Sequence, residues 1–324
     1  MKNPKAALKL ESLETREVPS AVTWTGNGST LYWSDDGNWN TNHRPASGDS
    51  VSIPANVNSF QDIVNLKLGN LTLNGGDTLA LTEPLTLDGN VVGSQILGQG
   101  SAQNLIYGGG GLTITGGNPI FEVAGGSSVA IAAKISGNTS LEKIGSGTLE
   151  LDNDNSYTGY TVVHAGVLAL NDPNANSHAL PNTTLYVGQG LATSATVKLL
   201  RDNQLNDTAS IALNSDGRLE LNGFSDTVGP LTVVGGSSIT TGTGTMTLNW
   251  GIGLDIGTFS TAVLVTGNIS LGSTDQVFSV LDAAPGSSLI LNGVISGGPN
   301  AGIIKTGPGE LSLNDSSTAP NTYG

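Results

Sequence analysis

The chain has 324 residues, of which 37% are apolar, 12% are charged and 46 are glycine, and its formal net charge is −14. This acidity excludes a phosphate backbone as a partner, because nucleic-acid binding depends on Lys and Arg. The absence of cysteine excludes disulfides, thiolate zinc sites and a cysteine nucleophile, and no stretch approaches the roughly 20 apolar residues of a membrane-spanning helix.

Residues 1–20 form a charged segment that predicts a short helical leader ending at Val18-Pro19, since the residue before a proline disfavours helix. Within this segment, LESLETREVPS (Leu10–Ser20) resembles an N-terminal motif of many large, presumed exported proteins of planctomycete-type bacteria. The resemblance implies a leader or sorting-like segment. A frayed helix with no sorting role is the alternative.

Residues 21–55 contain three of the four tryptophans, Trp24, Trp33 and Trp39. Two interpretations stand side by side. The aromatic side chains can form an N-terminal cap, which covers the exposed end strand of a repeat fold. Alternatively, the same rings can form a platform that stacks on glycans.

From residue 56 to residue 324, short apolar pairs of the L-x-L type recur between Gly, Asn, Asp and Pro, for example Leu66/Leu68, Leu71/Leu73 and Leu85/Leu87. Alternation with a period of two predicts half-buried strands. Strands this short at close spacing favour a parallel β-solenoid over a sandwich or a propeller. Two or three of them make a coil of roughly 20–25 residues, within the range of known solenoid repeats.

One long repeat supports the solenoid. The segment SLEKIGSGTLELDNDNSYTG (140–159) matches GIIKTGPGELSLNDSSTAPNTYG (302–324), with Lys143 answering Lys305. The second copy stops where the first continues. We therefore expect a truncated repeat and a frayed C-terminal end.

The first copy and its continuation resemble the autotransporter-associated β-strand repeat, also called the passenger-associated transport repeat. The residues that carry the resemblance are Lys143, Gly145, Gly147, Thr148, Leu149, Leu151, Asn155, Tyr157, Thr158, Gly159, Thr161, Val163, Gly166, Leu168 and Leu170. The sequence departs from the pattern at Asp152 to Asp154, where a glycine is usual. The resemblance implies a right-handed parallel β-helix in a surface-exposed or secreted passenger, and it brings no catalytic residues.

Few residues suggest further chemistry. The histidines His43, His164 and His178 lie far apart in the sequence, which disfavours a metal site. Asp152 and Asp154 are two apart and could hold calcium through oxygen ligands, but an Asn/Asp turn at a coil corner is the favoured interpretation. We expect no cofactor and no catalytic residue.

The sequence thus predicts an all-β fold, a parallel β-helix with a short helical leader. It indicates an exported surface or secreted protein that acts as a structural scaffold or an adhesin-like passenger without catalysis. Partners would be surface glycans or other cell-surface proteins, and the chain itself would not span a membrane. The alternative is a carbohydrate-binding or polysaccharide-degrading β-helix.

Overall fold

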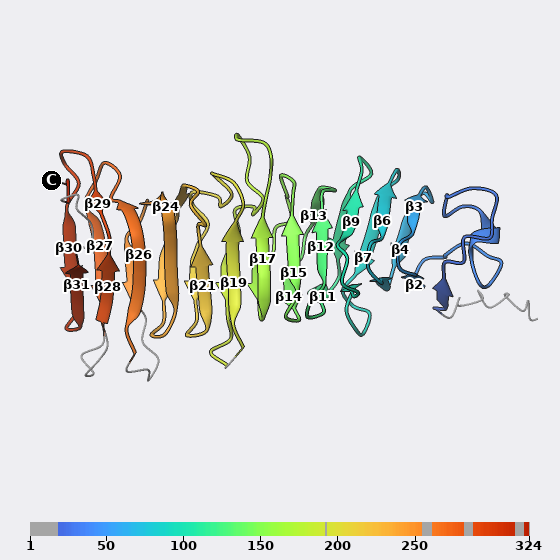
Figure 1. Cartoon of the computed structure of the whole chain (residues 1–324), viewed down its shortest axis with the longest axis horizontal. Coiled ribbons are helices and arrows are strands. Elements are labelled where there is room, and N and C mark those ends of the chain that lie inside the picture. Colours follow the sequence, from blue (N-terminus) through green and yellow to red (C-terminus); the bar gives the residue numbers. More distant parts are fainter. Residues whose placement is uncertain (1–18, 192, 255–260, 282–287, 315–320, 324) are drawn as a thin grey trace, which may run out of the picture.

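The structure is a computed structural model that describes residues 19–191, 193–254, 261–281, 288–314 and 321–323. Figure 1 shows an elongated stack of coils, with the Trp-rich segment at one end and strands β30 and β31 at the other. In the described part of the chain, the single helix is a 3₁₀ turn, η1 (Asp36–Asn38). The predicted helical leader lies outside the described residues, except for Pro19 and Ser20.

The coils build two long parallel sheets and one short one. The first sheet has 13 strands in the order β1 (Ala21–Thr23), β2 (Ser50–Ile53), β5 (Asn70–Leu73), β8 (Ile96–Gly98), β11 (Ile120–Val123), β14 (Leu141–Ile144), β16 (Thr161–Val163), β18 (Leu185–Val187), β20 (Ile211–Leu213), β23 (Leu231–Val233), β25 (Ile252–Leu254), β27 (Gln276–Val280) and β30 (Ile303–Thr306).

The second sheet has 14 strands, and two of them, β22 and β29, pair beside the main path. Its strands are β3 (Asn58–Gln61), β6 (Thr78–Leu81), β9 (Asn104–Tyr107), β12 (Ser128–Ile131), β15 (Thr148–Leu151), β17 (Gly166–Leu170), β19 (Ala195–Leu199), β21 (Gly217–Glu220), β24 (Ser238–Leu248), β26 (Val263–Ser270), β28 (Ser288–Asn292) and β31 (Glu310–Asn314), with β22 (Asp226–Val228) on β24 and β29 (Ile295–Ser296) on β26. The third sheet has four strands, β4 (Leu66–Leu68), β7 (Leu85–Asp88), β10 (Leu112–Thr115) and β13 (Ile135–Gly137).

The strand order confirms the predicted parallel β-solenoid. Each strand pairs in parallel with its counterpart one coil later, so that Ser50 lies opposite Asn70 and Leu149 opposite Leu168. Because neighbouring strands lie about 4.8 Å apart, equivalent side chains stack in columns along the axis. The alternating Leu, Val and Ile residues fill the inside of these columns and form one continuous core.

The two ends of the described chain differ. At the N-terminal end, β1 and β2 already belong to the first sheet, so the solenoid begins within the predicted cap of residues 21–55. At the C-terminal end, Thr322 forms a parallel bridge with Ser296. The predicted fraying of the C-terminus concerns residues 315–320 and 324, which lie outside the described residues.

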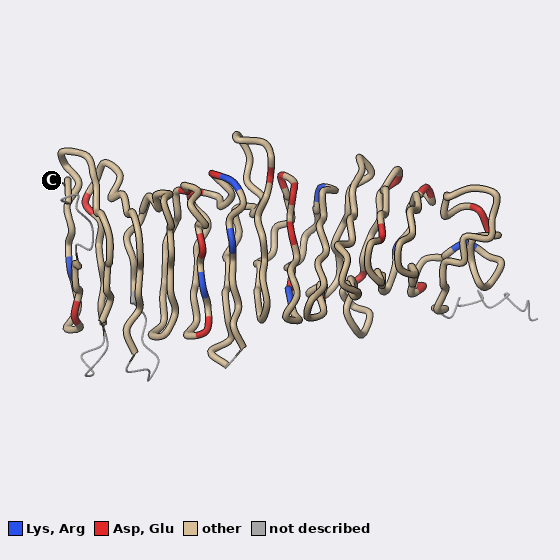
Figure 2. The backbone as a smooth tube through the Cα atoms, in the orientation of Figure 1, with Lys and Arg blue, Asp and Glu red and all other residues tan. Residues whose placement is uncertain are grey.

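Charged residues lie along most of the stack, as Figure 2 shows, but strands β24, β26 and β28 carry none. Acidic positions outnumber basic ones along the tube, in keeping with the net charge of −14. Within the described ranges, no helix has both the length and the apolar character needed to cross a bilayer.

Candidate functional site

Lys143, the first residue of the repeat motif, points into the solenoid. It lies in β14 between Phe121 of the coil before and Val163 of the coil after, and its side chain is fully buried. Its Nζ donates to the carbonyl oxygens of Ile144 (2.8 Å) and Gly145 (2.7 Å) and, one coil further, of Ala165 (3.1 Å). The ammonium therefore links two coils at their corner.

Burial lowers the pKa of Lys143 to about 8, and the negative charge of Glu122 opposes this shift. A buried ammonium without partners would be strongly unfavourable, so the three carbonyl acceptors are what allow a lysine in the core. Lys305 lies opposite Phe278 in the same register and donates to the carbonyl oxygens of Thr306 (3.4 Å) and Gly307 (2.6 Å), but its side chain is exposed.

The motif glycines are needed at close contacts between coils. Gly145 has φ +75°, and an added Cβ would lie 2.3 Å from the carbonyl oxygen of Val123. Gly307 has φ +78°, and its added Cβ would lie 2.3 Å from the carbonyl oxygen of Val280. Only glycine combines this backbone conformation with this approach, so the two sequence copies share one local structure.

Asn155 joins three successive coils through its side-chain amide. Its Oδ1 accepts the backbone N–H of Ile135 (2.8 Å), and its Nδ2 donates to the carbonyl oxygen of Ala179 (2.8 Å). Tyr157 is buried two residues later, and its hydroxyl is 2.7 Å from Oγ1 of Thr161. Burial raises the pKa of the Tyr157 hydroxyl far above its usual value, which keeps the group neutral.

The other motif residues also have structural places. Thr148, Leu149 and Leu151 form β15, in which the two leucines are buried, and the N–H of Thr158 donates to the carbonyl oxygen of Gly137 (3.1 Å). Gly159 and Gly166 approach the backbone of the preceding coil so closely that an added Cβ would lie 2.3 Å from Ser140 N and 2.5 Å from Gly145 O, respectively. The motif therefore encodes contacts between coils.

The Asp-rich corner separates the two carboxylates that could have held calcium. Asp154 is exposed and its Oδ2 lies 3.5 Å from Nζ of Lys134. Asp152 instead lies beside Glu150, and burial together with the charge of Glu150 raises its pKa to about 7, while Arg201 lowers it. The two carboxylates have different neighbours, and the segment is a coil corner between β15 and β16.

The histidines are not brought together. His164 Nε2 lies 3.1 Å from Oε2 of Glu142, and its other ring nitrogen faces Gln189. His178 Nδ1 lies 3.2 Å from the carbonyl oxygen of Asn203. Across the described parts of the chain, no group of three His, Cys, Asp or Glu side chains has the geometry to hold a metal ion.

The three tryptophans require a correction of the predicted glycan-stacking platform. Trp24, Trp33 and Trp39 are 3%, 0% and 1% exposed, and Trp39 contacts both other rings edge-to-face at 5.1 and 5.4 Å. Buried rings offer no face to a sugar. The segment instead pairs with the first strand of the second sheet, where Tyr32 bridges Phe60, and so covers that edge.

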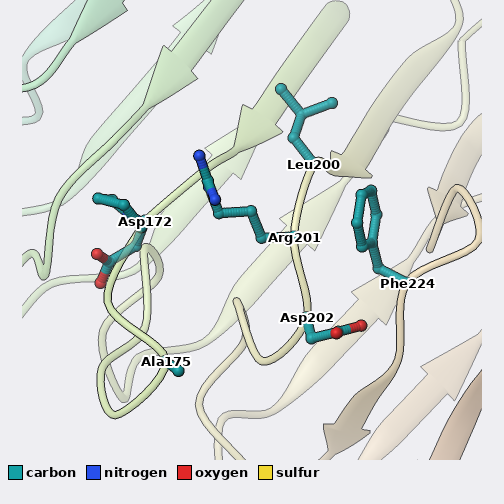
Figure 3. A pocket seen from close by; sticks show the side chains of 7 residues that line it. Asp172, Ala175, Leu200, Arg201, Asp202 and Phe224 are labelled. Carbon is teal, nitrogen blue, oxygen red and sulfur yellow. The ribbon is translucent and has the colours of Figure 1, made fainter.

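One pocket next to the repeat was not foreseen from the sequence. It has a volume of about 450 Å³ and lies beneath the long loop after β17, lined by Asp172, Pro173, Ala175, Leu200, Arg201, Asp202 and Phe224. Figure 3 shows Arg201 reaching toward the side of Asp172, while Leu200 and Phe224 lie on its other side. Arg201 Nε donates to Oδ1 of Asn171 at 2.8 Å.

Beneath this pocket lies a buried polar network. Gln204 accepts the N–H of Asp172 through Oε1 (2.6 Å), and Asp226 accepts the N–H groups of Gln204 (2.6 Å) and Leu205 (3.0 Å). These residues come from three coils. In a chain rich in Asn and Asp, polar residue types do not indicate burial, so the sequence alone does not predict this network.

The comparison with protein families identifies the repeat. The model of the family described as passenger-associated-transport-repeat matches residues 141–170. Neither the search of curated proteins nor that of solved structures gave a match. The matched residues are those whose side chains and glycines join neighbouring coils. Residues 141–170 thus match a passenger-associated transport repeat, and they lie within a parallel β-solenoid.

Proposed function

We propose that this protein is exported and acts at the cell surface, or as a secreted protein, as a non-catalytic β-helical scaffold or adhesin-like passenger. The match to the transport repeat is the observation that carries the proposal. Polar side chains of the motif form hydrogen bonds with the backbone of the next coil: Lys143 donates to the carbonyl oxygen of Ala165, and Asn155 donates to that of Ala179. We infer that the role of these residues is structural: they hold a long surface in a fixed shape.

Such a solenoid suits an extended display surface. Each coil pairs along the sheets with the coil before it and the coil after it, which satisfies the backbone groups of its strands. Outward-facing side chains are therefore free to vary without affecting the core. We propose surface glycans or other cell-surface proteins as the partners of this surface.

Protease treatment of intact cells tests the location. We expect an externally added protease to remove the protein from intact cells that express the full chain, while a cytoplasmic marker in the same cells survives. Lysed cells serve as the positive control for cleavage. Protection of the protein in intact cells, together with its absence from the medium, would contradict export.

A second candidate function is polysaccharide degradation, and the pair Glu150 and Asp152 favours it. A carboxyl group whose pKa is raised to about 7 beside a second carboxylate can act as a general acid near neutral pH. In the non-catalytic proposal, this pair is part of a coil corner. Its neighbour Asn171 binds Glu150 Oε1 through Nδ2 at 2.7 Å.

A turnover assay separates the two functions. We expect the protein to release no new reducing ends or unsaturated products from a panel of neutral and acidic polysaccharides between pH 5 and 8. The variants Glu150→Gln and Asp152→Asn should behave like the parent protein. Turnover by the parent protein that either substitution abolishes would overturn the non-catalytic proposal and establish the second candidate.

A further inference from the structure

A shallow groove crosses the beginnings of β16, β18 and β20, on the surface of the first sheet. It has a volume of about 400 Å³, and its lining includes Tyr160, Asn182, Thr183, Thr184, Thr208 and Ser210. These residues immediately precede three successive strands of the sheet. Because adjacent strands lie about 4.8 Å apart, the groove extends over about 10 Å along the solenoid axis. We call it the Tyr160 groove.

Two exposed aromatic rings lie together at the Tyr160 groove: Tyr160 is part of its lining, and Tyr186 packs beside Tyr160. Tyr160 and Tyr186 are each 41% exposed, and their rings contact edge-to-face with centroids 6.0 Å apart. The Tyr160 hydroxyl accepts a hydrogen bond from Nδ2 of Asn118 at 2.9 Å, which fixes the ring. A tyrosine held in this way presents an apolar body and a polar tip to a ligand.

Thr183 has an unused hydroxyl in the lining of the groove. Its side chain is 8% exposed, and its Oγ1 is buried with no hydrogen-bond partner. The backbone N–H of the same residue is satisfied by the carbonyl oxygen of Pro181 at 2.7 Å. Buried hydroxyls normally find partners, so Thr183 Oγ1 offers a hydrogen bond that the described residues leave unused.

The chemistry of the lining selects an uncharged ligand. Its side chains are hydroxyls, an amide and a tyrosine, and none of them carries a charge. The charged groups next to the lining are acidic: Glu142, whose Oε1 accepts from Asn118 Nδ2 at 2.8 Å, and Asp207, which precedes Thr208 in the chain. An anion would find no cation in the lining and would face a chain of net charge −14.

The backbone of the groove disfavours an extended peptide as its occupant. The carbonyl oxygen of Thr184 accepts the N–H of Thr161 (2.9 Å), and that of Ser210 accepts the N–H of Leu185 (2.8 Å). These groups already belong to the ladder of the sheet. A peptide that adds as a strand needs unpaired backbone groups, and the strands under the groove are paired on both sides.

We propose that the Tyr160 groove binds a neutral oligosaccharide. The rings of Tyr160 and Tyr186 contact the apolar face of a sugar unit, and Asn182, Thr183 and Ser210 exchange hydrogen bonds with its hydroxyl groups. Ligand sites in proteins combine aromatic walls with a few placed polar groups in this way. The inference rests on the proposed surface role, in which glycans are among the partners, and it assigns that role a site and a class of ligand.

A glycan array probed with the full chain tests this proposal, followed by calorimetric titration of the neutral glycan that binds most strongly. We expect Tyr160→Ala and Tyr186→Ala each to weaken that binding at least tenfold. Tyr107→Ala is the matched control, since Tyr107 is an exposed tyrosine of the second sheet, 37% exposed. Its binding should equal that of the parent protein.

The variant Thr183→Val distinguishes a hydroxyl that binds ligand from one that only affects stability. Removing the orphaned hydroxyl while keeping the shape should raise the melting temperature of the free protein and yet weaken glycan binding several-fold. The proposal is overturned if the array retains only acidic glycans or none, or if binding survives both tyrosine substitutions. Each of these results leaves the protease test of surface location unaffected.

Discussion

Replacement of Asn155 by alanine is expected to lower the free energy of unfolding by about 3 kcal/mol. The side chain is 3% exposed and satisfies the N–H of Ile135 and the carbonyl oxygen of Ala179 in two other coils. Alanine leaves both buried groups without a partner, and each unsatisfied group costs about 1–3 kcal/mol.

Urea unfolding followed by circular dichroism measures this effect. Asn153→Ala is the matched control, because Asn153 is half-buried two residues earlier and its Nδ2 makes one hydrogen bond, to the carbonyl oxygen of Ala132 at 2.8 Å. We expect the control to lose no more than about 1 kcal/mol. Equal losses in the two variants would show that the link between three coils is not what makes Asn155 stabilising.

Asn155→Asp provides a sharper second variant. Aspartate keeps an acceptor for the N–H of Ile135 but places a second oxygen against the carbonyl oxygen of Ala179, where the amide donated. We therefore expect Asn155→Asp to be destabilised at least as much as Asn155→Ala at neutral pH. The same chemistry recurs in the second copy, where Oδ1 of Asn321 accepts the N–H of Ile295 at 2.9 Å.

The fold could be predicted from the sequence because its signal is local. Alternation such as that of Leu149 and Leu151 indicates which side chains face inward. Short strands between glycine-rich turns favour a solenoid. The same rule fails for Lys143, a polar residue in an inward position. Lys143 can lie there because three backbone carbonyl oxygens at the corner accept hydrogen bonds from its ammonium group. The periodicity of the sequence carries no information on such acceptors.

The candidate sites depended on stacking, which one sequence does not reveal. Tyr160 and Tyr186 belong to different coils and meet only because β16 and β18 pair in register. The sequence shows that three tryptophans cluster near the N-terminus, but it does not distinguish a buried cap from an exposed platform. Their burial follows from the position of residues 24–39 over the edge of β3, a long-range contact.

We expect the largest effect of pH on the free energy of unfolding to come from Asp226, which accepts the N–H groups of Gln204 and Leu205 in the buried polar network. Burial raises the pKa of this carboxyl to about 7, even though the N–H groups of Leu205 and Gln204 lower it, and the charge of Asp207 adds to the rise. The folded state then binds a proton that the unfolded state releases near pH 4. The contribution of the protonated Asp226 to the stability of the fold is therefore complete below pH 4 and is lost as the pH rises through 7.

We therefore expect the free energies of unfolding of the parent protein and of Asp226→Asn to diverge by about 4 kcal/mol between pH 4 and pH 8. The asparagine variant should be the more stable of the two above pH 7, because its neutral amide still accepts the N–H groups of Gln204 and Leu205 but carries no charge into the core.

Urea unfolding at several pH values measures the divergence. Glu310→Gln, a change at an exposed carboxylate, is the control for loss of charge alone. If the curves of the parent protein and Asp226→Asn run parallel, Asp226 is already ionised without penalty, and water must reach its buried Oδ1, which has no protein partner.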